Sequence, residues 1–106
     1  LRHLFIQLQG QFPAQYPIRL KFTSKLPEGE WGDVDLVKLK GQPTLRLQLS
    51  AKLDSEASLV ILFHEYAHCL DWKAKNDANL MDHSPLWGVH LSRIWSWYSE
   101  DQGIWA

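Results

Sequence analysis

The fold of this chain is decided by two adjoining segments, residues 44–50 (TLRLQLS) and residues 54–71 (DSEASLVILFHEYAHCLD). In the first segment, leucines alternate with polar residues, which is the pattern of a half-buried β-strand. In the second segment, apolar residues recur every three or four positions, which predicts an α-helix. The carboxylate of Asp54 suits the N-cap of that helix, and we expect the helix to run to about Lys75.

The same periodicities predict the other elements. We expect a helix over residues 1–10, strands over 18–23 and 31–39, and a last helix from 85 to about 100. Ser84 and Pro85 begin the last helix, as N-cap and first helical residue. This order predicts a single α+β domain over residues 1–106, with an N-terminal helix, a small three-stranded sheet and then two helices.

Composition and charge narrow the classes of function. The 106 residues are enough for one domain with a single core. The net charge is −1, from 11 basic and 12 acidic residues, which gives no electrostatic argument for binding nucleic acid or an anionic membrane. No apolar run reaches about 18 residues, so no membrane span is expected. Cys69 is the only cysteine, which predicts no internal disulfide and an intracellular location in the cytoplasm, nucleoid or nucleus.

The segment His64-Glu65-Tyr66-Ala67-His68 carries the residues with catalytic chemistry. On a helix its two histidines lie on one face, one turn apart, which suits two nitrogens that bind one zinc ion. Glu65 points about 100° away from His64, so it is not a ligand but can reach a metal-bound water and take its proton. The alternative is a pair of core histidines beside a surface glutamate.

A catalytic zinc site needs a third protein ligand and an open fourth position. We favour His83, at the start of the last helix, and keep His90 and Glu100 as alternatives. Ala74 excludes the compact arrangement with a third histidine at that position. Asp71 shares the face of the histidine pair, where it either orients an imidazole or is simply a polar surface residue.

The chain resembles the SprT-like (Spartan-type) zinc metallopeptidase domain. The matching segments are Leu47-Gln48-Leu49-Ser50, His64-Glu65-Tyr66-Ala67-His68 and His83-Ser84-Pro85-Leu86-Trp87. The resemblance implies that His64, His68 and His83 bind Zn²⁺ and that Glu65 is the catalytic acid and base. It also implies a zincin-like fold in which the last two helices carry the metal site, with a substrate cleft along an edge strand where a peptide pairs by β-augmentation.

The sequence also departs from the family pattern. Ser84 replaces a glycine, and Leu86 replaces an acidic residue. We expect a minimal form without the cysteine-rich zinc ribbon, and a protein or peptide substrate. Nucleic acid is a partner by family resemblance only, because the charge does not support it. The alternative function is a zinc-stabilised binding or regulatory module, with Asp82 or His90 in the fourth position, and a third reading is a metal-free globular domain.

Overall fold

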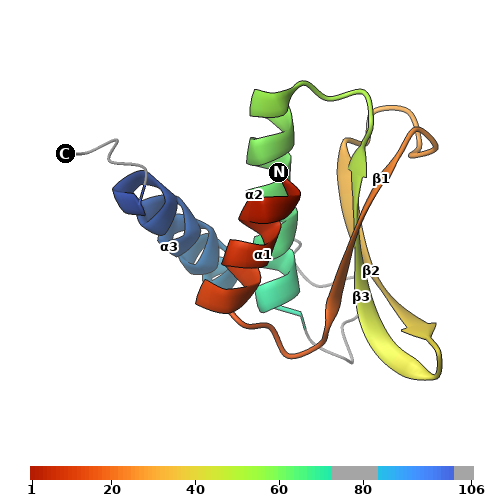
Figure 1. Ribbon diagram of the computed structural model, residues 1–106, viewed down its shortest axis with the longest axis horizontal. Helices are drawn as coiled ribbons and strands as arrows, with labels where there is room; N and C mark the ends of the chain where they lie inside the picture. Colours follow the sequence, from red (N-terminus) through yellow and green to blue (C-terminus); the bar gives the residue numbers. More distant parts are fainter. Residues whose placement is uncertain (73–83, 102–106) are drawn as a thin grey trace.

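The computed structural model describes residues 1–72 and 84–101 and contains the expected order of elements. These are α1 (Arg2–Gln11), β1 (Ile18–Thr23), β2 (Gly32–Leu39), β3 (Gln42–Ser50), α2 (Ser55–Leu70) and α3 (Pro85–Asp101) (Figure 1). The α+β prediction is therefore confirmed, with a mixed three-stranded sheet. Among the described residues, no helix combines the length and the apolar character that a membrane crossing requires.

The sheet has the strand order β1-β3-β2, so β3 is central and β2 is an edge strand. β1 runs parallel to β3, whereas β2 runs antiparallel to it. β2 and β3 are joined by a tight turn in which Lys40 (φ 52°) and Gly41 (φ 78°) both have a positive φ. Two successive positive φ values are characteristic of the type I′ hairpin turn. Because β3 pairs with only one edge of β2, the other edge of β2 has no neighbouring strand among the described residues.

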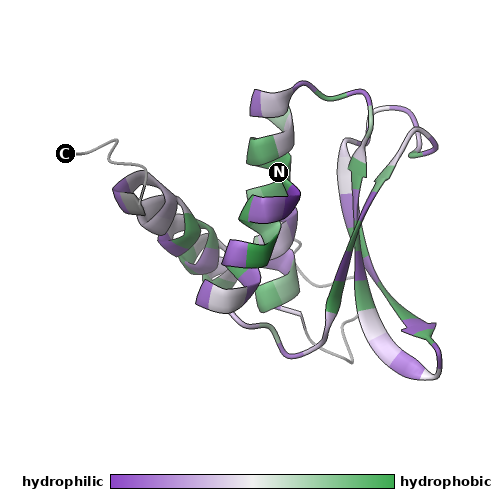
Figure 2. Cartoon of the chain, in the orientation of Figure 1, coloured by the Kyte–Doolittle hydropathy of each residue, from purple (hydrophilic) through white to green (hydrophobic). Residues whose placement is uncertain are grey.

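The core lies between the sheet and the three helices, which all cover the same face of the sheet (Figure 1). Leu45, Leu47 and Leu49 of β3 are fully buried, as their alternation predicts. Figure 2 shows apolar residues on the strands and on the helices opposite them. The other face of the sheet is polar, and there the guanidinium of Arg46 donates two hydrogen bonds, of 3.1 and 2.7 Å, to the carboxylate of Asp35. The amphipathic alternation of β3 thus places α2 against the middle of the sheet.

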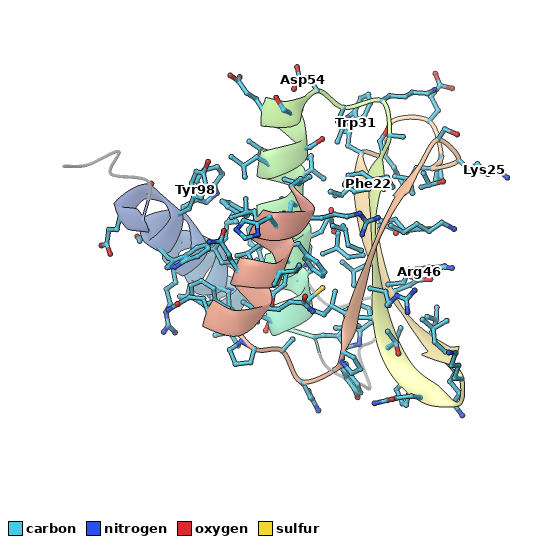
Figure 3. The ribbon with its side chains drawn as sticks, in the orientation of Figure 1. Phe22, Lys25, Trp31, Arg46, Asp54 and Tyr98 are labelled. Atoms are coloured by element: carbon cyan, nitrogen blue, oxygen red, sulfur yellow. The ribbon has the colours of Figure 1, made fainter. Side chains whose placement is uncertain are left out.

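Helix α2 begins as predicted but ends earlier. Asp54 lies at its start (Figure 3), where the Oδ1 atom accepts a hydrogen bond of 2.8 Å from the backbone N–H of Ala57. The expected end near Lys75 is wrong, because the helix ends at Leu70. The N–H of Trp72 bonds to the carbonyl of Cys69, which tightens the last turn and terminates the helix.

Helix α3 begins at the predicted cap and packs across α2. The Oγ atom of Ser84 accepts a hydrogen bond of 3.1 Å from the N–H of Trp87, and Pro85 is the first helical residue. Phe63 of α2 meets the rings of Trp95 and Tyr98 edge to face, with centroids 4.7 and 5.3 Å apart. This aromatic contact holds α3 against α2 and brings the first turn of α3 to the histidine pair.

Candidate metal centre

The two histidines of α2 lie at a separation that suits a shared metal ion. The ring centroids of His64 and His68 are 5.1 Å apart, and the rings are inclined by 67°. Two imidazoles bound to one tetrahedral zinc, with Zn–N distances of about 2.05 Å, have centroids about 5 Å apart. Both residues are half-buried on α2. The described pair therefore fits the first two ligands of a zinc site.

Glu65 is buried against the edge strand. It is 8% exposed, so the alternative of a surface glutamate is wrong. A Cβ atom added to Gly32 would lie 3.0 Å from the Cγ of Glu65 and 2.7 Å from the Cγ2 of Ile61. Only a residue without a side chain lets the β2 backbone pass α2 at this distance. The strand thus restricts the conformations open to Glu65 beside the two histidines.

Cys69 lies one turn after Glu65 on α2 and is 1% exposed. Burial raises the pKa of the Cys69 thiol, and the nearby charge of Glu65 raises it further. A neutral buried thiol is neither a nucleophile nor a ready metal ligand. Cys69 is therefore a small apolar residue of the core.

Trp87 of α3 contacts both imidazoles. Its ring stacks on His68 with centroids 5.3 Å apart and planes inclined by 27°, and it meets His64 at 5.0 Å and 66°. Its Nε1–H donates a hydrogen bond of 3.2 Å to the backbone carbonyl of His64. In the sequence, Trp87 closes the His83–Trp87 segment that matches the family pattern.

A serine and an aspartate tie the start of α3 to the end of α2. The hydroxyl of Ser84 donates a hydrogen bond of 2.6 Å to Oδ2 of Asp71 and accepts one from the N–H of Trp87. Asp71 is half-buried, and its Oδ2 atom is the acceptor for Ser84. The Ser84 hydroxyl thus reaches the carboxylate across the two helix ends, and an orienting role of Asp71 toward an imidazole stays a prediction.

The third ligand is not placed by the described residues. His83, together with Ala74 and Asp82, lies outside the described ranges. Within residues 1–72 and 84–101, no three histidine, cysteine, aspartate or glutamate side chains form a group that could hold a metal ion. His90 and Glu100 therefore do not complete the pair on α2. His83 stays a prediction from the sequence.

Helices α2 and α3 carry one tyrosine each, Tyr66 and Tyr98, and both pack in or against the core. Tyr66 is fully buried, and its hydroxyl donates a hydrogen bond of 2.7 Å to the carbonyl of Phe12, on the α1 side of the helix. Burial raises the pKa of Tyr66 well above its usual value. Tyr98 packs edge-on against Phe63 and Trp95. The hydroxyl of Tyr66 is thus committed to a structural contact, and no tyrosine is assigned to the chemistry.

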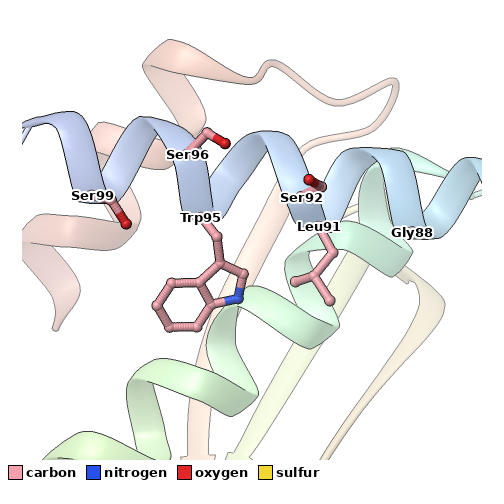
Figure 4. A pocket seen from close by; sticks show the side chains of 6 residues that line it. All are labelled: Gly88, Leu91, Ser92, Trp95, Ser96 and Ser99. Carbon is pink, nitrogen blue, oxygen red and sulfur yellow. The ribbon is translucent and has the colours of Figure 1, made fainter. Parts of the chain in front are cut away.

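A hollow of about 390 Å³ lies along α3 (Figure 4). Its lining residues are Gly88, Leu91, Ser92, Trp95, Ser96 and Ser99. They come from one helix and include no titratable side chain, so the hollow offers apolar contact and hydroxyl groups but no acid–base chemistry. The chemistry of the described residues is concentrated instead on His64, Glu65 and His68.

No family model, curated protein or solved structure matches this chain. The candidate site therefore depends on the geometry of the chain itself. That geometry consists of two imidazoles at metal-sharing distance, a buried carboxylate beside them and an indole that contacts both rings.

Proposed function

We propose that this protein is a zinc-dependent endopeptidase of the SprT-like type, which hydrolyses peptide bonds in protein substrates. The observation that carries the proposal is the 5.1 Å pairing of His64 and His68 with the buried Glu65 between them in sequence. This spacing supplies two ligands and a base from five residues of one helix. His83 is the third ligand in the proposal, on the strength of its place in the sequence.

Each residue has a separate task in the proposed reaction. His64, His68 and His83 would hold Zn²⁺ and leave a fourth position open. Zinc, when bound there, polarises a water molecule and the substrate carbonyl. The carboxylate of Glu65 accepts the proton of the attacking water and then delivers it to the leaving amine nitrogen. Contact with Gly32 keeps that carboxylate in a narrow range of positions, so its reach to the reacting atoms is set before the substrate binds.

The edge strand β2 is the proposed peptide-binding element. It is the last strand on its side of the described sheet, and its first residue, Gly32, lies against Glu65. An extended peptide that adds to this edge would pair through backbone hydrogen bonds and pass close to the carboxylate. The substrates proposed are therefore unfolded or extended protein segments. With a net charge of −1, the chain offers no general attraction for nucleic acid.

The second candidate is a zinc-stabilised binding module with little turnover. The contact of Trp87 with both imidazoles favours it, because a closely packed metal site is typical of structural zinc. The two candidates differ in the fourth zinc position. A structural site fills it with a protein group, whereas a catalytic site leaves it to solvent and substrate.

Zinc binding and proteolysis test the proposal together. We expect about one zinc ion per chain by elemental analysis, and cleavage of denatured casein that stops with a chelator and returns with Zn²⁺. His64→Ala, His68→Ala and His83→Ala should each lose both properties. His3→Ala and His90→Ala are the matched controls and should keep both, because His3 is exposed on α1 and His90 does not join the pair.

Two results would contradict the proposal in different ways. Stoichiometric zinc in the His64→Ala and His68→Ala proteins would place the metal elsewhere. Stoichiometric zinc in the wild type without cleavage of any unfolded protein would favour the binding module.

A further inference from the structure

The indole of Trp87 is the one described side chain outside α2 with ring contacts to both histidines. It stacks on His68 and meets His64 at a steep angle, with centroids 5.3 and 5.0 Å away. Its Nε1–H is hydrogen-bonded to the carbonyl of His64, so the ring is held at one edge by the helix that it covers. A single rigid plane therefore adjoins both proposed zinc ligands.

A plane of this kind limits how the imidazoles rotate. The terminal torsion of a histidine is broad, so a free imidazole samples many orientations, most of which cannot share a metal ion. Packing against the fixed indole removes many of those orientations before any metal arrives. Groups that orient metal-binding histidines from outside typically change metal affinity by about 10- to 100-fold when they are removed. The indole acts here through packing rather than through a hydrogen bond to the imidazole nitrogen.

The position of Trp87 is in turn set by the contact between Ser84 and Asp71. The Ser84 hydroxyl accepts from the Trp87 N–H and donates to the Asp71 carboxylate, so it connects the first turn of α3 to the end of α2. The carboxylate also lies near the N-terminus of α3, where a negative charge is favourable. Glycine, which the SprT-like pattern has in place of Ser84, could make neither side-chain bond. The connection is a feature of this chain's own sequence.

We propose that Trp87 is a positioning residue that orients His64 and His68, and that the Ser84–Asp71 contact holds it in place. The inference that the orientation serves zinc binding rests on the proposed function. The orientation itself is a property of the described residues and is measurable without metal. Trp87 does not touch the reacting atoms and has no catalytic task of its own.

The test compares Trp87→Leu with Trp97→Leu. Trp97 is on the same helix and packs edge-on against Phe12, with centroids 5.9 Å apart, so its loss removes an α3 indole contact on the α1 side. Both variants should lose stability, and circular dichroism and thermal unfolding identify the folded fraction. Only Trp87→Leu should weaken the ring-to-ring NOE signals between the imidazoles of His64 and His68 in the metal-free protein, because the two rings then rotate more freely.

Zinc affinity is the second readout, from competition with a chromophoric chelator. Trp87→Leu should bind zinc about 10- to 100-fold more weakly, whereas Trp97→Leu should stay within about threefold of the wild type. Trp87→Phe keeps an aromatic plane and should recover most of the affinity. Ser84→Gly should weaken binding by a smaller factor, and Ser84→Thr, which retains the hydroxyl, should restore it.

The outcomes separate this inference from the proposed function. Unchanged ring-to-ring NOE signals in metal-free Trp87→Leu would overturn the positioning role, whatever the metal does. Weakened NOE signals together with a zinc affinity equal to that of Trp97→Leu would overturn its link to metal binding. A wild type that binds no zinc would contradict the proposed function and the link to zinc, while the metal-free signals still decide whether Trp87 orients the rings.

Discussion

The two sides of helix α2 that meet at the candidate site are held in different ways. Glu65 faces the sheet, is buried, and is limited by the backbone of β2 at Gly32. His64 and His68 face the start of α3, are half-buried, and are covered by one indole. The carboxylate is thus positioned by a strand inside a hydrogen-bonded sheet, whereas the imidazoles depend on contacts between side chains.

This difference indicates which part of the site is fixed by the fold alone. A shift of Gly32 would disturb its pairing with Leu49 in β3, so the β2 backbone beside Glu65 cannot move without loss of strand pairing. The first turn of α3 can adjust more easily, because side-chain contacts of Ser84 and Trp87, rather than strand pairing, connect it to α2. We therefore expect a metal ion to stabilise the α3 side most, and perturbations of the sheet side to act through the position of the carboxylate.

Removal of zinc should have the largest effect on stability. A ligand that binds only the native state, at a free concentration of about 1,000 times its Kd, stabilises a protein by about 4 kcal/mol. Chelation should lower the unfolding temperature accordingly, as measured by differential scanning calorimetry. Hydrogen exchange should quicken around His64, His68 and Trp87, with little change in β2 and β3. Equal loss of protection in the sheet would contradict the difference between the two sides.

Gly32→Ala tests the sheet side. Its new Cβ would meet the Cγ2 of Ile61 at 2.7 Å and the Cγ of Glu65 at 3.0 Å, so α2 or β2 must shift. Overpacking of this kind costs about 1–3 kcal/mol. We expect lower stability by urea unfolding and lower kcat, with zinc affinity nearly unchanged. The matched control is Gly10→Ala, because a Cβ there meets nothing within 4 Å.

Ser84→Ala tests the α3 side. It removes the N-cap of α3 and the contact with Asp71, which should cost about 1 kcal/mol in the free energy of unfolding. Ser92→Ala, at an exposed position inside α3, is the control and should be neutral or slightly stabilising. Equal stabilities for the two variants, measured by urea unfolding, would show that the Ser84 contacts contribute little.

Asp33→Asn should have the smallest effect on stability. Asp33 follows Gly32 in β2, so this variant tests the charge on the edge strand. Burial raises the pKa of Asp33, the charges of Asp35 and Glu30 raise it further, and Arg46 lowers it. The native state therefore binds the proton more tightly than the unfolded state does, and stability falls as pH rises from the ordinary pKa to the raised one. Asparagine removes that cost, so the variant should be more stable at pH 7 by less than about 1 kcal/mol and show no gain below about pH 3.

Thermal unfolding of the Asp33→Asn variant and the wild type between pH 3 and 7 measures this difference. The control is Asp35→Asn, which breaks a paired carboxylate and should not stabilise. A gain that is the same at every pH would assign the effect to packing rather than to the charge of Asp33.

The sequence predicted the elements well where a local signal exists. The alternation of β3, the cap at Asp54 and the start of α3 at Ser84 each depend on neighbouring residues, and the structure has all three. The end of α2 was misjudged, because the polar residues that follow Leu70 do not contradict a helix by themselves. What ends the helix is the backbone geometry at Asp71 and Trp72, which periodicity does not reveal.

The site was predicted less completely, since its neighbours come from distant parts of the chain. The spacing of His64 and His68 shows that they share a face, but it does not reveal that Gly32 lies against Glu65. That contact depends on β2 pairing antiparallel to β3, an arrangement that single-strand patterns do not specify. The contact of Trp87 with both histidines had one signal in the sequence, the place of Trp87 in the His83–Trp87 segment.

The central claim is that Glu65 performs the chemistry while the histidines hold the metal. The most direct measurement is the rate at which zinc-loaded Glu65→Gln cleaves denatured casein, with zinc content determined on the same sample. Glutamine has nearly the same shape but cannot accept the proton, so we expect wild-type zinc content and a rate about 100- to 10,000-fold lower. Wild-type cleavage by a fully zinc-loaded Glu65→Gln protein would contradict the account.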